Sequence, residues 1–356
     1  MSITVLDAPL APLTTLRLGG PARRLVEART EDELVAAVRE ADAAGEPLLL
    51  LAGGSNVVIA DAGFDGTVVQ VATRGIERRR LADGRVAVTV QAGELWDALV
   101  AGLVADGLAG VECLAGIPGS AGATPIQNVG AYGQEVAGTI RAVRALDRAT
   151  GDVVELAPED CAFGYRTSAF KGKQSHAILA VSFALRPDRL GLPLRYAELG
   201  RALDAAPGQR VPLADARTAV LELRRGKGMV LDAGDRDTCS AGSFFTNPVL
   251  EPRAFDALCR RAAALPGARG EPPRFDEPGG HVKTSAAWLI EAVGFRRGDA
   301  RGSVALSSKH VLALTNRGGA SAGELLAFAH EIADLVELRL GVRLRPEPVL
   351  VGASWD

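Results

Sequence analysis

The chain has 356 residues, of which 47% are hydrophobic and 23% are charged, and its formal net charge is −3 at pH 7. This length allows two or three domains, each with its own core. The small net charge does not indicate a nucleic-acid or membrane-surface partner. The sequence opens without a basic segment and apolar run, so no signal peptide is expected, and the apolar run at 47–60 is too short to span a bilayer.

The cysteines and histidines form no recognisable metal or redox motif. Cys113, Cys161, Cys239 and Cys259 are scattered, without a C-x-x-C pair. They are typical of reduced thiols in a cytoplasmic protein. The four histidines make no H-E-x-x-H pattern. We therefore expect a cytoplasmic protein without a catalytic metal.

Hydrophobic periodicity predicts α/β elements in the first 215 residues. Thr30 and Glu33 form a candidate capping box for a helix that runs to about Ala44. A second helix is expected at 94–108, and the segment 192–213 is interpreted as a connector. Strands are expected at 47–51, 66–72, 85–93 and 177–187, with a hairpin that turns at Thr150 and Gly151.

A third unit is expected to begin near residue 217. Helices are predicted at 253–264 and around 286–294, and strands at 304–308 and 311–316. The last helix should start at Ser321, boxed by Glu324, and stop at Gly341. The tail 343–352 contains two prolines, so it is expected to be an edge strand or a strand entry. The fold class is α+β.

Two glycine-rich segments are candidate ligand loops: AGGSN at 52–56 and GIPGSAGATPIQNVGAYG at 116–133. Glycine lets the backbone approach a ligand, and clustered N–H groups bind anionic oxygens. Turn chemistry explains the first segment equally well. The second is long for a simple connection, which favours ligand binding. Together they suit a diphosphate-bearing cofactor, and the absence of G-x-G-x-x-G does not support a Rossmann nicotinamide site.

Three further residues have both a functional and an ordinary interpretation. Arg166 in FGYRTSAFK is either a surface cation or a fork that clamps a carboxylate. Glu347 lies between two prolines and is either a solvated edge charge or a pre-positioned carboxylate. Ser243 in CSAGSFFTNP is either a small residue in a tight place or a reactive hydroxyl.

The assembled motifs resemble the MurB family, the UDP-N-acetylenolpyruvoylglucosamine reductases of bacterial peptidoglycan synthesis. The matching segments are AGGSNVVI, GIPGSAGATPIQNVGAYGQE, YRTSAFK, AGSFFTNPV, KTSAAWLIE, VLALTN and LRPEPV, in family order from about residue 14 onward. The resemblance implies two FAD-binding subdomains of the PCMH type and a substrate-binding domain. Their expected bounds are 1–74 joined by 344–356, 75–215, and 216–343.

The resemblance also implies the site residues. Arg166, Ser243 and Glu347 match the catalytic positions. The residues matching the FAD-binding positions are Gly53, Gly54, Ser55, Asn56, Ile117, Gly119, Gly122, Ala123, Gln127, Asn128, Gly130 and Tyr132. The residues matching substrate-contacting positions are Tyr196, Lys227, Asn247, Phe275 and His310.

The implied reaction passes hydride from NADPH to non-covalent FAD and then to the vinyl carbon of UDP-N-acetylglucosamine enolpyruvate. Arg166 and Glu347 would stabilise the enolate-like charge, and Ser243 would donate the proton to the neighbouring carbon. Either Lys227 or Asn247 would assist the serine alkoxide. NADPH and the UDP-sugar would use one site in turn. The implied setting is a monomeric cytoplasmic enzyme of cell-wall synthesis, cell shape and cell division.

The chain departs from the family pattern at a few positions. Thr246 replaces a common lysine, and Pro348 replaces a β-branched residue. Phe275 stands where one branch places a tyrosine over the nucleotide diphosphate, so this contact would rest on packing and Arg274. His310 replaces an expected glutamine. The alternatives are another non-covalent FAD oxidoreductase of this architecture and a non-catalytic nucleotide-sugar sensor.

Overall fold

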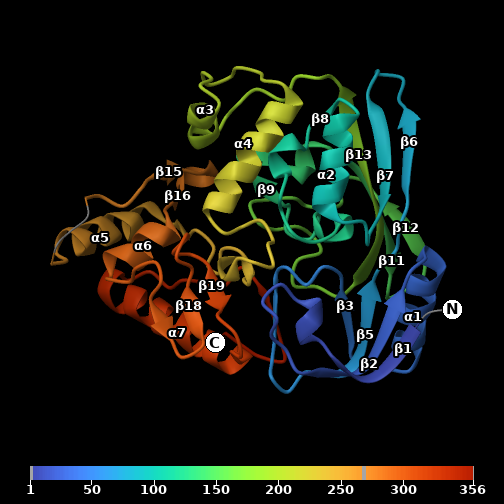
Figure 1. The fold of residues 1–356 in the computed structure, drawn as a ribbon, viewed down its shortest axis with the longest axis horizontal. Helices are drawn as coiled ribbons and strands as arrows, with labels where there is room; N and C mark the ends of the chain where they lie inside the picture. Colours follow the sequence, from blue (N-terminus) through green and yellow to red (C-terminus); the bar gives the residue numbers. More distant parts are fainter. Residues whose placement is uncertain (1–2, 267–269, 356) are drawn as a thin grey trace. The chain divides into compact units, whose positions relative to one another are not determined.

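The computed structural model describes residues 3–266 and 270–355, which divide into two compact units. Unit 1 comprises the described part of Met1–Ala8 with Ala22–Gly54 and Asp65–Val230. Unit 2 comprises Pro9–Pro21, Ser55–Phe64 and the described part of Leu231–Asp356. Helices and strands occur in both units, as expected for the α+β class (Figure 1). The division at 1–74, 75–215 and 216–343 remains a prediction.

Unit 1 is built on a four-stranded and a six-stranded sheet, and β9 and β10 form a separate two-stranded sheet. Its strands and α-helices are β1 (Ile3–Pro9), β2 (Pro21–Ala28), α1 (Glu31–Ala43), β3 (Leu48–Leu51), β5 (Phe64–Val71), β6 (Ile76–Arg80), β7 (Val86–Gln91), α2 (Trp96–Ala105), β8 (Leu108–Ala109), β9 (Gly130–Ala131), β10 (Gln134–Glu135), β11 (Ile140–Asp147), β12 (Val153–Leu156), β13 (His176–Pro187), α3 (Ala197–Ala202) and α4 (Leu213–Gly226). Short 3₁₀ turns are η2 (Glu112–Leu114), η3 (Ala121–Ala123) and η4 (Val136–Gly138).

The four-stranded sheet of unit 1 has the order β1-β2-β5-β3 and leads into the first glycine-rich loop. Helix α1 begins as predicted, because the Thr30 side chain accepts a hydrogen bond from the Glu33 N–H. The reciprocal contact differs from a capping box, since the Glu33 carboxylate accepts from the Arg29 N–H at 2.9 Å. Strand β3 is parallel to β5, so the loop after β3 leaves the carboxyl end of the sheet.

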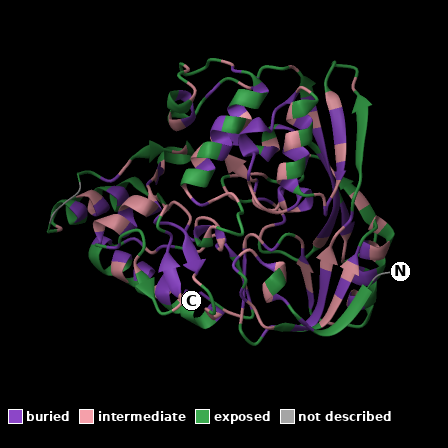
Figure 2. Ribbon diagram, in the orientation of Figure 1, coloured by how far each residue is buried: buried purple, intermediate pink, exposed green. Residues whose placement is uncertain are grey.

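The larger sheet has the order β12-β11-β13-β7-β6, and β8 also pairs with β13. Most of β13 is buried on consecutive residues, as Figure 2 shows. Successive strand side chains point to opposite faces, so both faces of the sheet are covered at this strand. The edge strand β6 is exposed throughout and carries Arg78, Arg79 and Arg80. Charged side chains on an edge strand hinder pairing with other chains.

The helices after the larger sheet differ from the sequence prediction. Helix α2 occupies Trp96–Ala105 within the expected 94–108. The expected connector 192–213 contains α3, and α4 follows at Leu213–Gly226, where no helix was predicted. Leu213, Ala216 and Val220 recur with helical spacing on the buried face of α4. That periodicity was the available signal for α4.

Unit 2 packs its helices and short strands around one core. Its elements are η1 (Ala11–Leu13), β4 (Val57–Ile59), η5 (Arg236–Thr238), β14 (Val249–Leu250), α5 (Pro252–Ala263), β15 (Phe275–Asp276), η6 (Pro278–Gly280), β16 (Val282–Lys283), α6 (Ala286–Ala292), β17 (Ala300–Arg301), β18 (Val304–Leu306), β19 (Leu314–Asn316), α7 (Ala322–Leu340) and β20 (Val349–Val351). The core includes Phe244, Phe245 and Phe328, each 1% exposed.

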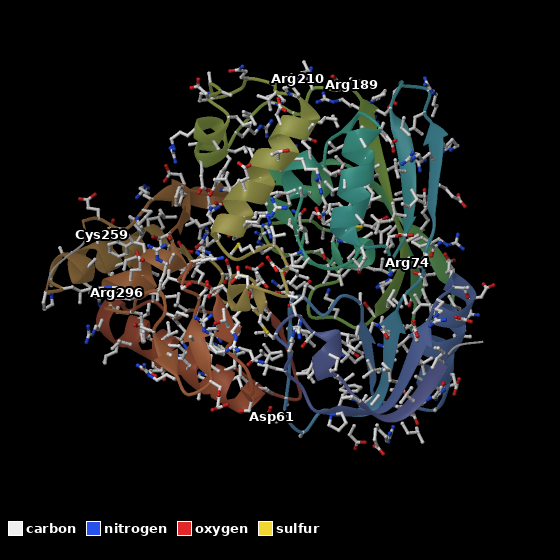
Figure 3. The ribbon with its side chains drawn as sticks, in the orientation of Figure 1. Asp61, Arg74, Arg189, Arg210, Cys259 and Arg296 are labelled. Carbon is white, nitrogen blue, oxygen red and sulfur yellow. The ribbon has the colours of Figure 1, made fainter. Side chains whose placement is uncertain are left out.

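Helix α7 begins and ends where the sequence predicts. Ser321 and Glu324 form both hydrogen bonds of a capping box, and Gly341 ends the helix with φ of 73°. The carboxylate of Asp61, labelled in Figure 3, accepts hydrogen bonds from the N–H groups of Ala322 and Gly323 at 2.7 and 2.9 Å. A negative charge at a helix N-terminus stabilises the helix dipole. A residue far away in sequence therefore reinforces the local cap.

The predicted tail strand is confirmed as β20, which is shorter than 343–352 and begins directly after Pro348. It pairs in parallel with β4, with Val349 opposite Val57. The sheet formed by β20 and β4 has no further strand among the described residues, so β20 is an edge, as its prolines require. The strand expected at 311–316 is formed only at Leu314–Asn316, because Ala313 donates back to His310 in a turn.

A membrane-spanning helix needs about 20 mostly apolar residues. In the parts of the chain that the structure describes, no helix combines enough length and apolar character to cross a bilayer.

Candidate active site

The first glycine-rich loop lies against the second within unit 1. Strand β3 ends at Leu51, and Gly54 adopts a φ of 54°. A Cβ atom at Gly53 would lie 2.7 Å from the Cα of Gly119. The two backbones therefore touch at a point where a side chain would keep them apart. The predicted loops are brought together by this contact.

The second loop is held by backbone hydrogen bonds to the segment before α2. Gly119 accepts from the Trp96 N–H at 3.1 Å, and Gly122 donates to the Ala92 carbonyl at 2.9 Å. A Cβ at Gly122 would lie 2.4 Å from the Ala92 Cβ. Ala123 ends the 3₁₀ turn η3, and Ile117 packs on the core of unit 1. The loop is ordered structure rather than a loose connection.

A buried carboxylate supports this loop, and sequence analysis missed it. Glu112 is 1% exposed. Its carboxylate accepts hydrogen bonds from the Gly110 N–H, the Leu192 N–H and the Gln134 amide at 2.7–2.8 Å. Several donors around a buried carboxylate offset the cost of removing it from water. This network ties both ends of the glycine-rich segment to the residues before α3.

One observation tests whether the loop fits a ligand. Ser120 is 3% exposed, and its hydroxyl has no hydrogen-bond partner among the described residues. Buried polar atoms are normally paired with protein or water, so an unpaired hydroxyl between Gly119 and Gly122 is consistent with a polar group of a ligand. The closely apposed glycine backbones and this hydroxyl fit an anion-bearing cofactor such as FAD.

Arg166 lies beside the second loop within unit 1. The Asn128 amide donates to the Gly164 carbonyl at 3.1 Å, and the Ser168 hydroxyl donates to the Ile126 carbonyl at 2.6 Å. A Cβ at Gly130 would be 3.5 Å from Nη1 of Arg166. The Arg166 guanidinium therefore lies next to Gly130, in the part of the second loop that also carries Gln127 and Asn128.

The backbone around Arg166 is unusual. Asn128, Tyr132 and Arg166 have φ of 45°, 50° and 53°, in the left-handed region that non-glycine residues rarely adopt. The ammonium of Lys171 donates to the Arg166 carbonyl at 2.8 Å, which holds this conformation. Such strain clusters at functional sites in proteins.

An aromatic and cationic cluster of unit 1 contains several predicted site residues. The rings of Tyr132 and Tyr196 meet edge to face, with centroids 5.4 Å apart. Nζ of Lys227 lies 5.6 Å from the Tyr132 ring centroid and 2.6 Å from a carboxylate oxygen of Glu198. Burial raises the pKa of the Tyr132 hydroxyl. The predicted residues Tyr132, Tyr196 and Lys227 are therefore neighbours.

Arg224 belongs to the same cluster and was not predicted from the sequence. It is 9% exposed, and its Nε has no partner among the described residues, although its other end donates to the Met229 carbonyl at 2.9 Å. Burial lowers the pKa of Arg224 to about 10, and the positive charge of Arg166 acts in the same direction. The signal in the sequence was an arginine on the apolar face of α4, three residues before Lys227.

Ser243 and Glu347 lie on paired segments within unit 2. The Glu347 N–H donates to the Phe244 carbonyl at 2.8 Å, and Phe245 pairs with Pro346 across the same bridge. Asn56, from the first loop, donates through its side-chain amide to the Glu347 carbonyl at 3.3 Å. Ser55 and Asn56 thus belong to unit 2, whereas Gly53 and Gly54 belong to unit 1. Ser243 and Glu347 are both half-buried.

Asn247 is oriented by a helix. Its side-chain oxygen accepts a hydrogen bond from the Ala286 N–H at 3.0 Å, at the first residue of α6. Because a backbone N–H can only donate, the side-chain oxygen must face it, and the amide NH₂ is the end directed elsewhere. Asn247 is therefore presented as a hydrogen-bond donor.

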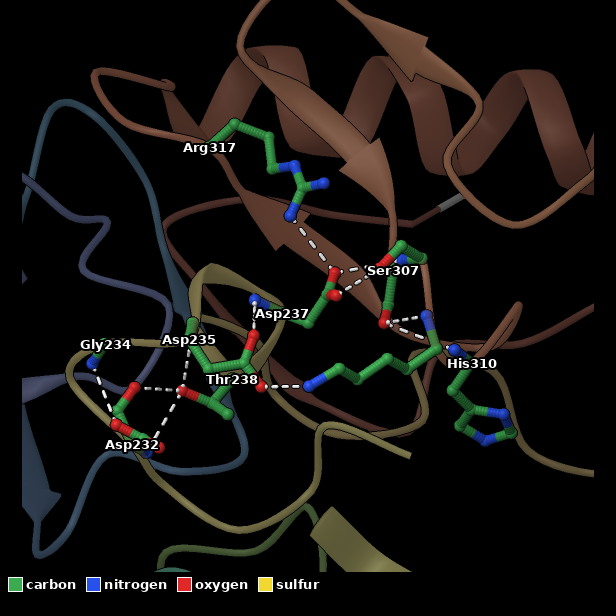
Figure 4. Close-up of polar contacts among 10 residues, drawn as sticks. Asp232, Gly234, Asp235, Asp237, Thr238, Ser307, His310 and Arg317 are labelled. Carbon is green, nitrogen blue, oxygen red and sulfur yellow. Dashed lines mark hydrogen bonds and ion pairs between the residues drawn. The ribbon is translucent and has the colours of Figure 1, made fainter. Parts of the chain in front are cut away.

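His310 follows a turn that is anchored by a buried acid, as Figure 4 shows. The Ser307 hydroxyl accepts from the His310 N–H at 3.2 Å. Asp237, 4% exposed, accepts from the Ser308 N–H at 3.0 Å and from Arg317 at 3.1 Å. Burial alone would raise the pKa of Asp237, but the Ser308 hydrogen bonds and the Arg317 charge outweigh it, and the pKa is lowered.

Phe275 is 52% exposed on β15, opposite Lys283 of β16. Arg274 lies over the Phe255 ring at 5.4 Å from its centroid and also pairs with Asp276. Phe275 is thus the ring that this hairpin presents to solvent, while Arg274 is held by contacts of its own.

Two family models match the chain. The model described as an FAD binding domain matches residues 22–157. The model described as the C-terminal domain of UDP-N-acetylenolpyruvoylglucosamine reductase matches residues 235–351. The matches fall on the part of the chain with both glycine-rich loops and on the part with Ser243 and Glu347.

Curated relatives match over nearly the whole chain. The UDP-N-acetylenolpyruvoylglucosamine reductase of Streptomyces coelicolor is 58% identical over 350 residues, which cover 98% of this chain and 90% of the relative. The reductase of Thermobifida fusca is 51% identical over 348 residues, which cover 98% of each. Among solved structures, the reductase (MurB) from Thermus caldophilus matches with a TM-score of 0.64 and 24% identity over 99% of both chains, which supports the fold.

The predicted resemblance is therefore confirmed at high identity and over nearly full length, together with the predicted combination of an FAD-binding domain and a family-specific C-terminal domain. The chain belongs to the UDP-N-acetylenolpyruvoylglucosamine reductase family.

Proposed function

We propose that this protein reduces UDP-N-acetylglucosamine enolpyruvate to UDP-N-acetylmuramate with NADPH, using non-covalent FAD. The observation that carries the proposal is the 58% identity to a named reductase over 98% of the chain. The geometry is consistent with it, because each unit gathers the residues that this chemistry needs. The setting we propose is peptidoglycan precursor synthesis by a cytoplasmic monomer.

The cofactor would be held by the two glycine-rich loops. Gly53, Gly54, Gly119 and Gly122 leave room for close backbone approach, and the unpaired Ser120 hydroxyl offers a polar contact. Ser55, Asn56 and the Ile117–Tyr132 segment complete the proposed set. When bound, FAD supplies the hydride that reaches the vinyl carbon of the substrate.

The substrate's charges would be met by cations and amide donors. The residues that we propose to contact the UDP-sugar are Tyr196, Lys227, Asn247, Phe275 and His310. Asn247 is suited to this role because its amide NH₂ is directed away from α6. NADPH would use the same site before the UDP-sugar enters it, which gives ping-pong kinetics.

Three side chains would stabilise the negative charge that hydride addition creates and supply the proton that completes the reduction. Addition of hydride to the vinyl carbon leaves negative charge on the enolpyruvyl carboxylate, and Arg166 would stabilise it with its fixed cation. Glu347 would donate a hydrogen bond to the same group in its protonated form. Ser243, whose neighbour Phe244 accepts a hydrogen bond from the Glu347 N–H, would donate a proton to the carbon beside the carboxylate.

Anaerobic stopped-flow absorbance separates these steps. The flavin band should bleach with NADPH and return on adding UDP-N-acetylglucosamine enolpyruvate. In Ser243→Ala we expect bleaching at the parental rate, because the serine takes no part in it. Return of the band should slow by about 10²–10⁴-fold, the usual contribution of a positioned general acid.

Ser240→Ala is the matched control. It removes a hydroxyl from the same segment, one that accepts the Gly242 N–H at 3.2 Å, and should leave both phases near parental rates. Equal loss of both phases in Ser243→Ala would refute the proton-donor role. Bleaching without any return in the parent protein would indicate a different flavin oxidoreductase, and no flavin band after adding FAD would indicate a non-catalytic sensor.

A further inference from the structure

The cation that we propose for substrate binding already has an anionic partner. Nζ of Lys227 lies 2.6 Å from Oε2 of Glu198, and the two side chains are each 31% exposed. Glu198 lies in the first turn of α3, two residues after Tyr196, and Lys227 is the C-cap of α4. The ion pair therefore joins two helices at the side of the Tyr132–Tyr196 ring pair.

Glu198 supplies negative charge to Lys227, which is one of several cations near Tyr132. Arg166, Arg224 and Lys227 all act on this cluster, and Arg224 is buried with an unpaired Nε. Two other acids have hydrogen-bond partners of their own: Glu135 accepts from Asn128 at 2.8 Å, and Asp97 accepts from the Gly116 N–H at 2.6 Å while its charge also acts on Arg224. Glu198 is thus the acid placed directly on Lys227.

Partial burial makes this position costly for an unpaired charge. Burial alone would lower the pKa of Lys227, but the hydrogen bond that Lys227 donates to Glu198, together with the charge of Glu198 and the nearby tyrosines, outweighs it, and the pKa is raised. Lys227 therefore stays protonated at neutral pH while its charge is neutralised locally. An anionic ligand that binds Lys227 must therefore compete with the Glu198 carboxylate for the ammonium.

We propose that Glu198 competes with the diphosphate of a bound nucleotide for Lys227, so that Glu198 lowers ligand affinity and eases product release. This inference rests on the proposed function of Lys227. A diphosphate at Lys227 would stand close to the Glu198 carboxylate, and like charges repel at such distances. Binding would exchange the Glu198–Lys227 ion pair for a diphosphate–Lys227 pair.

A role for Glu198 in positioning Lys227 would change ligand affinity in the opposite direction. If Glu198 only positioned Lys227, its neutralisation would loosen the ammonium and weaken ligand binding. If Glu198 competes, its neutralisation should tighten binding. Glutamine keeps the size of the side chain and removes the charge, so Glu198→Gln separates the two roles.

The experiment is calorimetric titration of the FAD-loaded protein with UDP, with NADP⁺ and with uridine. For Glu198→Gln we expect about a three- to fivefold lower Kd, on the order of one partly exposed charge pair, for UDP, NADP⁺ or both. Uridine, which has no phosphate, should bind with an unchanged Kd. The gain should shrink as salt is raised from about 0.05 to 0.5 M, because salt screens charges.

Two variants act as controls. Asp188→Asn removes a carboxylate that pairs with Arg210, which is labelled in Figure 3. The side chains of Asp188 and Arg210 are 34% and 35% exposed, close to those of Glu198 and Lys227. The Kd values of this variant should stay within about twofold of the parent. Glu198→Asp keeps the charge and should also stay within about twofold of the parent.

The possible results separate this inference from the function on which it rests. Lys227→Met should raise the Kd of the same diphosphate by about tenfold or more. If Lys227→Met has no effect, both the substrate-binding role and the competitor role fall. If Lys227→Met weakens binding while Glu198→Gln leaves it unchanged or weakens it, only the competitor role is overturned. Tightening for UDP alone or for NADP⁺ alone supports it and identifies the diphosphate concerned.

Discussion

Replacement of Gly53 by alanine tests whether contact between the two glycine-rich loops is needed for flavin binding. The new Cβ would lie 2.7 Å from the Gly119 Cα and 3.3 Å from its carbonyl carbon. Carbon atoms pack best at about 3.5–4.0 Å, so the methyl group would be about 1 Å too close. Both neighbours are backbone atoms, and neither can rotate away as a side chain would.

The loops must therefore separate to accept the methyl group. Overpacking of this kind costs about 1–3 kcal/mol. If the loops relax apart in the free protein and must close again on FAD, the cost appears in the binding step. It then corresponds to an FAD Kd raised by about 5- to 150-fold, since about 1.4 kcal/mol is tenfold.

The assay is titration of flavin-free protein with FAD, followed by quenching of flavin fluorescence, beside urea unfolding of the same samples. Gly102→Ala is the control, because Gly102 lies inside α2 with nothing within 4 Å of its added Cβ. It should keep the parental Kd and gain about 0.5–1 kcal/mol in the free energy of unfolding. An unchanged FAD Kd in Gly53→Ala would refute the proposed contact between loops and cofactor.

Two further predictions concern ionisable groups. Because the folded-state pKa of Asp237 is lowered, its contribution to stability should be fully present above its unfolded pKa of about 3.9 and be lost as pH falls through the folded value. Asp237→Asn should therefore lower the free energy of unfolding by about 1–3 kcal/mol at pH 7. In urea unfolding, the difference in this free energy between the parent and the variant should narrow below about pH 4. A difference that does not depend on pH would contradict this reasoning. Burial raises the pKa of the fully buried Cys161 thiol to about 11, with Asp160 and Glu159 adding to the effect. Alkylation followed by peptide mapping at pH 8 should find Cys161 unmodified in the folded protein and modified in urea, and rapid labelling of the folded protein would count against the burial argument.

Much of the architecture could be predicted because its signals are local. The capping box of Ser321 and Glu324 and the glycine at 341 define α7 through residues that lie within one turn of each helix end. The prolines beside Glu347 similarly predict an edge strand. Helix α4 was missed, although its apolar spacing was readable, because the segment before it was interpreted as a connector.

The site residues were predicted from motifs, and their assignment to catalysis and binding remains a proposal. The structure adds the neighbours that motifs do not contain. Glu112 fixes the second loop through Leu192, and Glu198 reaches Lys227 across 29 positions of sequence. Arg224 belongs to no sequence motif, and only its burial beside Tyr132 and Arg166 indicates that it is part of the site.

The sequence by itself determined the family, the α+β class and the order of the glycine-rich, serine-bearing and glutamate-bearing segments, because these are properties of short stretches of chain. Only the tertiary structure decided which charges meet. Asp61 reinforces the cap of a helix 261 positions away, and one backbone hydrogen bond pairs Glu347 with Phe244, the residue after Ser243. Such contacts depend on how distant segments pack, and packing is set by the whole core rather than by the residues adjacent in sequence.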